Sequence, residues 1–112
     1  MPLLELMSDK LAAEGFVVIR AEDGEKGLEL AKKNQPDLIL LDILLPKIDG
    51  IEMLRRLRDD DWGAKAQVVL LTNLSDSEKV AEATKLGAYD YLVKSDWKLE
   101  DVVKKVKEKL KV

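Results

Sequence analysis

The stretch from Pro36 to Gly50 constrains the fold of this chain most, because it joins the most hydrophobic run in the sequence to a carboxylate. Leu38–Leu41 is apolar without alternation and lies between a proline and a turn. Such a run predicts a strand that is buried on both faces of a parallel sheet. Asp42 then stands at the carboxyl end of the strand, where open α/β sheets bind their ligands. The sequence alone leaves open a second interpretation, in which Asp42 only caps a turn.

The bulk composition describes one globular domain over residues 1–112. Hydrophobic residues make up 46% of the chain and charged residues 37%, and no apolar run is long enough to span a membrane. A net charge of -3 gives no electrostatic reason to expect nucleic acid as a partner. Cysteine is absent and no secretory signal pattern is present, so a cytoplasmic location is expected. Histidine is also absent, which leaves carboxylates, hydroxyls and lysines as reactive groups.

Helical and strand patterns alternate along the chain. Apolar, β-rich segments predict four strands, Phe16–Ala21, Asp37–Asp42, Gln67–Thr72 and Tyr89–Lys94. Amphipathic spacing and capping residues predict five helices, which begin near Leu3, Asp23, Asp49, Ser75 and Leu99. Strands that alternate with helices indicate an α/β fold with a parallel sheet, right-handed crossovers and helices on both faces.

Three of the predicted strands end on reactive side chains, Asp42, Thr72 and Lys94. Each residue taken alone suits an ordinary structural role, as a turn acid, a threonine close to a helix or a surface lysine. Because the carboxyl ends of parallel strands lie side by side, the three groups are expected to converge on one small anionic group. A carboxylate is a known nucleophile for phosphoryl transfer, and the transferred charge requires a cation and positioned donors.

The segment Leu40–Gly50, Leu-Leu-Asp-Ile-Leu-Leu-Pro-Lys-Ile-Asp-Gly, resembles the phosphoacceptor strand and following loop of the receiver domain of two-component response regulators. The resemblance extends over nearly the whole chain. It implies that Asp42 accepts a phosphoryl group from a sensor histidine kinase or a phosphotransfer protein. It further implies that Thr72 reports phosphorylation and that Lys94 pairs with the acceptor and its phosphate. The protein would then be a signalling module, catalytic at most in its own phosphoryl transfer.

The same resemblance assigns a switch position and a metal site. Tyr91, three residues before Lys94, matches the aromatic switch residue, although a core ring on a strand is the alternative. The backbone carbonyl of Leu44 and the carboxylate of Asp42 would be ligands of Mg²⁺. Ser95 follows the lysine where the family usually has a cis-proline, which makes the switch role of Tyr91 less secure.

The larger departure from the family is at the amino-terminal end of the given sequence. Receiver domains normally open with a strand that ends in two acidic residues, and this sequence starts in the first helix. The fold class expected is therefore a flavodoxin-like, doubly wound parallel sheet with four strands and five helices, in which the first, central strand is missing. Without the acidic pair, the Mg²⁺ site would be incomplete and phosphorylation impaired.

Two arrangements would compensate for a missing central strand. Phe16–Ala21 could shift by one strand spacing, about 4.8 Å, and pair directly with Asp37–Asp42. Alternatively, two chains could complete each other, so that a homo-oligomer, at least a dimer, is expected. In the first arrangement Glu22 and Asp23 could replace the missing acidic pair, although a turn and a helix cap suit them better.

Three other functions compete with a phosphorylated receiver. A pseudo-receiver, or an engineered truncated fragment, would act as an interaction or oligomerisation module without phosphorylation, through the surface near Tyr91 and Trp97. An aspartyl-phosphate hydrolase would carry a second aspartate where this chain has Leu44. A nucleotide-binding domain would need a glycine-rich phosphate loop, and no such motif is present.

Overall fold

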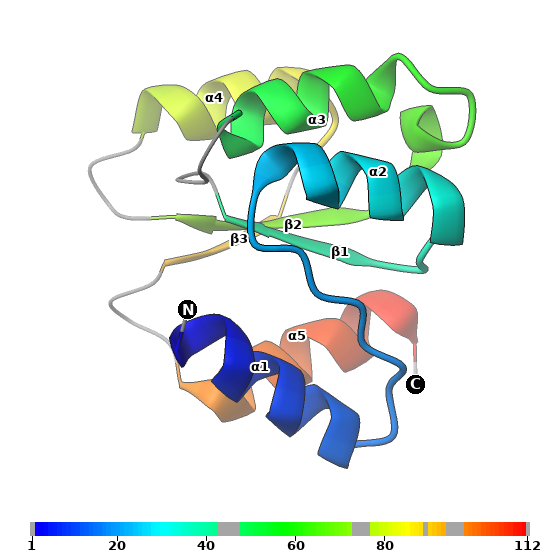
Figure 1. The fold of residues 1–112 in the computed structure, drawn as a ribbon. Helices are drawn as coiled ribbons and strands as arrows, with labels where there is room; N and C mark the ends of the chain where they lie inside the picture. The colour runs from blue at the N-terminus through cyan, green and yellow to red at the C-terminus, as the bar shows by residue number, and fades with distance from the viewer. Residues whose placement is uncertain (1, 43–47, 73–76, 89, 94–97, 112) are drawn as a thin grey trace.

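The protein is a three-layered α/β sandwich with a parallel sheet in the middle (Figure 1). A computed structural model describes residues 2–42, 48–72, 77–88, 90–93 and 98–111. The described residues form three strands, β1 (Ile39–Asp42), β2 (Val68–Thr72) and β3 (Asp90–Val93), in the order β1-β2-β3. Both strand pairs are parallel, with Leu41 beside Leu70 and Leu70 beside Tyr91. Three of the four predicted strands and the parallel sheet are therefore confirmed.

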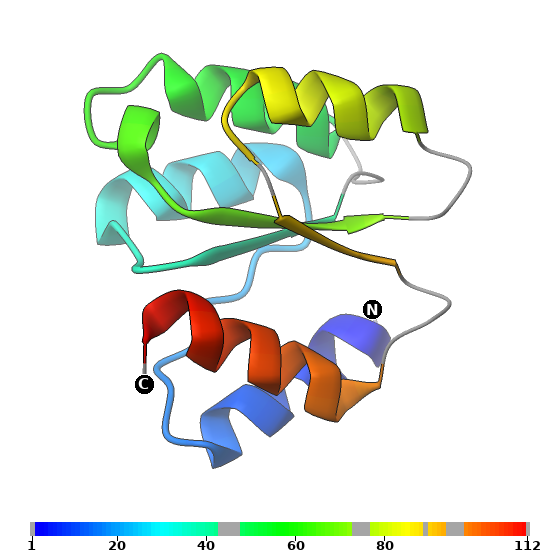
Figure 2. The same ribbon diagram turned by 180° about the vertical axis from the view of Figure 1, so that it is seen from behind.

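All five predicted helices are present, and they cover both faces of the sheet. Figures 1 and 2 show α2, α3 and α4 on one face and α1 and α5 on the other. Their bounds are Pro2–Ala13 (α1), Gly24–Asn34 (α2), Gly50–Arg58 (α3), Ser77–Lys85 (α4) and Leu99–Leu110 (α5), and a short 3-10 helix, η1, covers Gly63–Lys65. None of the described helices combines the length and the apolar character that a membrane crossing requires.

Local chemistry explains where several helices begin and end. Asp23 precedes α2, and its Oδ1 accepts a hydrogen bond of 2.8 Å from the backbone N–H of Lys26. The carboxylate therefore satisfies one of the donors that a helix leaves unpaired in its first turn. Gly15 after α1 and Gly87 after α4 have positive φ angles of 96° and 86°, which a glycine adopts without steric cost.

The sheet separates two hydrophobic clusters. The larger cluster lies under α2, α3 and α4 and contains Leu41, Leu54, Leu57 and Leu70. The smaller cluster lies under α1 and α5 and is formed by these buried residues: Met7, Leu11, Leu71, Val102, Val103 and Val106. All five residues of β2 are buried, as the lack of polar alternation in the sequence indicates for a strand covered on both faces.

The prediction of a fourth strand over Phe16–Ala21 is wrong for this structure. These residues have no strand assignment and no partner in the sheet, and Val17 is 93% exposed. The proposed shift of this segment onto β1 is equally wrong, because a cavity of about 570 Å³ lies between them. The β-rich composition favours an extended backbone, but a strand forms only where a neighbour accepts its hydrogen bonds.

Candidate functional site

The candidate site lies at the edge of the sheet where the strands end. Asp42 is the last residue of β1 and Thr72 the last residue of β2. Leu71 is the direct neighbour of Asp42 across the ladder, so Thr72 follows one residue further along. The structure thus brings two of the three predicted reactive residues to the same edge. The third, Lys94, lies outside the described residues, as do Leu44, Ser95 and Trp97.

The two described site residues differ in exposure. Asp42 is half-buried, whereas Thr72 is only 2% exposed. The buried hydroxyl of Thr72 is held by a strand whose every residue is buried, so its position is fixed by packing on both faces of the sheet. Asp42 retains access to solvent.

The helices α3 and α4 begin on the same side of the molecule as the site (Figure 1). Asp49 caps α3, and its Oδ1 accepts a 2.8 Å hydrogen bond from the backbone N–H of Glu52, as the capping pattern in the sequence predicts. Its Oδ2 lies 3.4 Å from the ammonium nitrogen of Lys79, in the first turn of α4. The hydrogen bond from Glu52 and the positive charge of Lys79 lower the pKa of the Asp49 carboxyl. The pair links the starts of two helices beside the site.

A close contact fixes Ile48, which precedes the capping residue of α3. Gly24, the first residue of α2, lies so near the backbone of Ile48 that a Cβ atom there would overlap the Ile48 carbonyl oxygen. Only glycine permits this approach without displacing the backbone. The contact holds Ile48, and with it the capping residue Asp49, against the start of α2.

Tyr91 lies on β3, paired with Leu70 of β2, and the residue is 50% exposed. The alternative interpretation of Tyr91 as a core ring is therefore wrong. The same strand begins with Asp90, whose carboxylate accepts a hydrogen bond from Lys109 of α5, and this bond lowers the pKa of Asp90. Sequence reasoning did not find the Asp90–Lys109 and Asp49–Lys79 pairs, because 19 and 30 residues separate their members and no local pattern links them.

The residues that the structure describes do not fit a Mg²⁺ site. They contain no group of three or more carboxylates that could hold a metal ion. Glu22 and Asp23 line the same cavity as Asp42. Asp23 caps α2, which is the structural role expected for it from the sequence, and Glu22 is exposed. With the Asp42 carboxylate alone, water would have to supply most of the six oxygen ligands of Mg²⁺.

A parallel sheet with helices on both faces and an aspartate at a strand end defines the class of doubly wound α/β domains. Residues 2–107 match the family model of the response regulator receiver domain, and the chain belongs to this family. The resemblance drawn from Leu40–Gly50 is thereby confirmed. Receiver domains act in two-component, phosphorelay signalling.

Known proteins of this kind cover most of the chain. It is 39% identical over 107 residues to the DNA-binding dual master transcriptional regulator RpaA of Synechocystis, which covers 96% of this chain and 44% of that protein. It is 37% identical over 92 residues to the alkaline phosphatase synthesis transcriptional regulatory protein PhoP of Bacillus subtilis, which covers 82% of this chain and 38% of that protein. The chain therefore spans less than half of the length of these relatives.

Solved structures agree with the fold. The chemotaxis response regulator CheY4 of Vibrio cholerae superposes with a TM-score of 0.88 at 27% identity, over 97% of this chain and 90% of that chain. A protein assigned as a response regulator from Chloroflexus aurantiacus superposes with a TM-score of 0.86 at 32% identity, over 99% of this chain and 90% of that chain. The flavodoxin-like arrangement expected from the sequence is therefore confirmed, with three strands in the described residues.

Proposed function

We propose that Asp42 is the phosphoacceptor of a receiver domain in a phosphorelay. The observation that carries this proposal is the position of Asp42 at the end of β1, beside the end of β2, in a chain that matches the receiver family over residues 2–107. A carboxylate oxygen of Asp42 attacks the phosphorus atom of a phosphohistidine, and the bond from phosphorus to the histidine nitrogen breaks. The donor is a sensor histidine kinase or a phosphotransfer protein, and the reaction takes place in the cytoplasm.

Thr72 and Lys94 are proposed to stabilise the transferred group. The hydroxyl of Thr72 donates a hydrogen bond to a phosphoryl oxygen, and the ammonium of Lys94 pairs with its negative charge. Tyr91 follows the state of Thr72 as a switch residue, and its half-exposed ring on the neighbouring strand supports this role. The domain catalyses at most its own phosphoryl transfer.

We further propose that residues 1–112 alone are phosphorylated slowly. The described residues contain no group of three carboxylates that could hold a metal ion at Asp42, so a divalent cation would compensate the charge of the incoming phosphoryl group poorly. This deficit also favours the second candidate function, a pseudo-receiver that binds partners without phosphorylation. Both functions use the same fold and differ only in the chemistry at Asp42.

Mass spectrometry after incubation with acetyl phosphate and Mg²⁺ separates the candidates. Slow formation of an adduct about 80 Da heavier, absent in Asp42→Asn and unchanged in Asp37→Asn, is the expected result. No adduct after prolonged incubation identifies the pseudo-receiver. Rapid, complete conversion that requires Asp42 would contradict the proposed deficit, and an adduct that persists in Asp42→Asn would exclude Asp42 as the acceptor.

Residues 1–112 are also proposed to form a homo-oligomer, at least a dimer. Several large apolar side chains are exposed, Leu6, Val17, Ile19 and Tyr91 among them, and association would cover them. Light scattering at micromolar concentration is expected to give at least twice the 12.6 kDa mass of the chain. A single species of 12.6 kDa would refute this proposal.

A further inference from the structure

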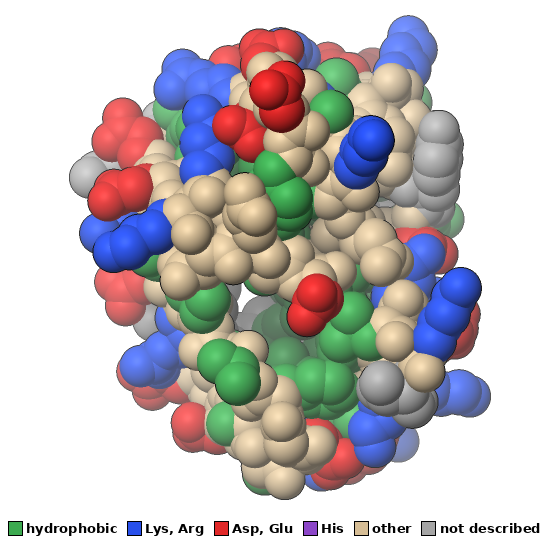
Figure 3. Space-filling view, turned by 90° about the vertical axis from the view of Figure 1, so that its right-hand side faces the viewer, with side chains coloured by type: hydrophobic (Ala, Val, Ile, Leu, Met, Phe, Trp, Pro, Cys, Tyr) green, Lys and Arg blue, Asp and Glu red, His purple; other side chains and the backbone are tan. Residues whose placement is uncertain are grey.

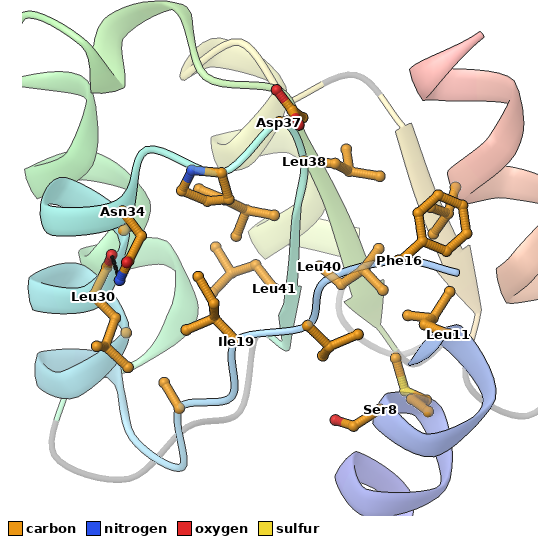
Figure 4. A pocket seen from close by; sticks show the side chains of 18 of the residues that line it. Ser8, Leu11, Phe16, Ile19, Leu30, Asn34, Asp37, Leu38, Leu40 and Leu41 are labelled. Atoms are coloured by element: carbon orange, nitrogen blue, oxygen red, sulfur yellow. Dashed lines mark hydrogen bonds between the residues drawn. The ribbon is translucent and has the colours of Figure 1, made fainter. Parts of the chain in front are cut away.

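The helices of this protein are attached to their neighbours in two different ways. α1 and α2 present apolar side chains to the space beside β1, where Figure 3 shows a hollow lined by hydrophobic residues. Figure 4 shows Leu11 of α1 and Leu30 of α2 at the wall of this space, and the amide of Asn34 donates a 3.0 Å hydrogen bond to the Leu30 carbonyl within α2 itself. α3 and α4, in contrast, are joined to each other by charged side chains.

The polar contacts between α3 and α4 follow one another from the start of α4 to its end. The ammonium of Lys79 lies 3.4 Å from the carboxylate that caps α3. Glu82 pairs with Arg55 at 3.3 Å, and the carbonyl of Leu86, just after α4, accepts a 2.6 Å hydrogen bond from Nε of Arg58. Lys79, Glu82 and Leu86 are three and four residues apart in sequence. They therefore lie on one face of α4, and this face is turned toward α3.

These contacts become stronger toward the end of α4. The side chains of Asp49 and Lys79 are 42% and 41% exposed, so water and salt compete with their ion pair. Arg58 is half-buried and also donates hydrogen bonds to the carbonyls of Gly63 and Ala66. Bonds from a guanidinium are stronger than those between neutral groups. α4 is therefore pinned at its end and held more weakly at its start.

The position of Lys79 explains why its partner matters. Lys79 is in the first turn of α4. The first turn of a helix carries a partial positive charge, so a cation there is unfavourable unless an anion lies beside it. The carboxylate of Asp49 supplies this anion from α3. Without this carboxylate, Lys79 would weaken the first turn of α4 instead of holding it in place.

We propose that the Asp49–Lys79 ion pair is a latch that restrains the first turn of α4, and that α4 opens from this end while Arg58 holds the other. The latch lies on the same side of the molecule as the candidate site, because α3 and α4 begin where β1 and β2 end (Figure 1). It restrains the part of α4 with the weaker polar attachment. Opening at the first turn leaves the contacts of Arg58 intact.

The latch also bears on the chemistry at Asp42, and this consequence rests on the proposed function. Residues 73–76 join Thr72 to α4, so a displacement of the first turn reaches the residue that follows Thr72. Thr72 is 2% exposed, whereas Asp42 is half-buried. A phosphoryl group on Asp42 gains access to the Thr72 hydroxyl when this part of the chain yields. The closed latch therefore slows the uptake of a phosphoryl group by Asp42.

The test is a double-mutant cycle at the ion pair, read by amide hydrogen exchange in α4. Asp49→Asn keeps a good capping residue but removes its charge, and Lys79→Gln removes the cation. Exchange is followed by NMR at Ala81, at the first hydrogen-bonded position of α4, and at Ala88, which is hydrogen-bonded beyond the pinned end. Lys85→Gln, at an exposed position of the same helix, is the matched control.

Each single variant of the pair is expected to speed exchange at Ala81 by about two- to fivefold at low salt and to leave Ala88 unchanged. The double variant should add nothing further, because the latch is already open. High salt should speed exchange at Ala81 in the parent protein but not in the variants. Additive effects, or rates equal to those of the parent, would overturn the proposal. Slower exchange in Lys79→Gln, as the helix dipole alone predicts, would also overturn it.

Phosphorylation of Asp42 gives a second readout. Lys79→Gln is expected to form the acetyl phosphate adduct about two- to fivefold faster than the parent and Lys85→Gln. Loss of a positive charge would by itself slow the reaction with an anionic donor, so an equal or slower rate would overturn the link between the latch and Asp42. If neither the parent nor any variant forms an adduct, the proposed function fails, whereas the exchange rates at Ala81 still decide whether the latch exists.

Discussion

Arg58 gives the sharpest test of how the fold is held together. It is the last residue of α3, half-buried, and its guanidinium donates hydrogen bonds to three backbone carbonyls from separate segments. Nε lies 2.6 Å from the oxygen of Leu86, and Nη1 lies 2.6 Å from that of Gly63 and 2.8 Å from that of Ala66. One side chain thus connects the end of α3 to η1, to the residues before β2 and to the end of α4.

The cost of removing this side chain follows from the three bonds. A hydrogen bond to a charged group contributes about 1.5–3 kcal/mol when water is excluded, and an ordinary bond about 1 kcal/mol. Water can reach part of this half-buried site and replace some of the lost partners. Arg58→Ala should therefore lower the free energy of unfolding by about 3 kcal/mol. Arg58→Lys should still cost about 2 kcal/mol, because an ammonium group cannot reproduce the fork of the guanidinium.

Urea unfolding followed by circular dichroism measures both effects. The control is Arg55→Ala on the same helix, since Arg55 is 48% exposed and pairs with Glu52 and Glu82 at the surface. Such exposed pairs contribute less than about 1 kcal/mol. If Arg58→Ala were no more destabilising than Arg55→Ala, the structural role of the three carbonyl bonds would be refuted. If Arg58→Lys matched the parent protein, charge alone would suffice.

Three further changes should have distinct outcomes. The carboxyl of Asp49 has a lowered pKa because it accepts a backbone N–H bond at the start of α3 and pairs with Lys79, so its stabilising contribution is present above about pH 4 and is lost as the pH falls through the lowered value. Unfolding titrations between pH 2 and 7 should show a smaller acid destabilisation in Asp49→Asn than in the parent, and an unchanged profile would contradict this. Gly63→Ala should cost about 1–3 kcal/mol, because the added Cβ overlaps the carbonyl oxygen of Leu57, and a thermal midpoint equal to that of the parent would refute the contact. Leu54→Ala should cost about 2–5 kcal/mol in urea unfolding, because Leu54 is 0% exposed, and a loss below 1 kcal/mol would show that the core is not packed around it.

The helices and three strands could be predicted from the sequence because their signals are local. The apolar stripe from Leu99 to Leu110 and the caps at Asp23 and Asp49 specify structure within a few residues of themselves, and the structure confirms each of them. Phe16–Ala21 shows the limit of such signals. Its composition favours an extended backbone, but strand pairing depends on a neighbour that no local pattern supplies, and the segment has no strand assignment.

The candidate site was predictable to the same extent. Placing Asp42 and Thr72 at the ends of adjacent strands required only the strand boundaries and the parallel topology, and both are confirmed. The roles of these residues stay predictions. The pairing of Asp49 with Lys79 beside the site could not be foreseen, because it depends on how closely α3 and α4 approach each other in three dimensions.

The edge of the sheet at β1 also determines how the molecule should open. α1 packs its side chains in one cluster with α5 and Leu71 of β2, and Glu14, just after α1, forms an ion pair of 3.0 Å with Lys107. α1 makes no hydrogen bond of the β-ladder in the described structure. α1 and Phe16–Ala21 can therefore leave as one unit while β1, β2 and β3 stay paired. Such a unit opens at a lower free energy than the whole domain. Arg20, exposed in its extended backbone, then becomes the first point at which a protease such as trypsin can divide the chain.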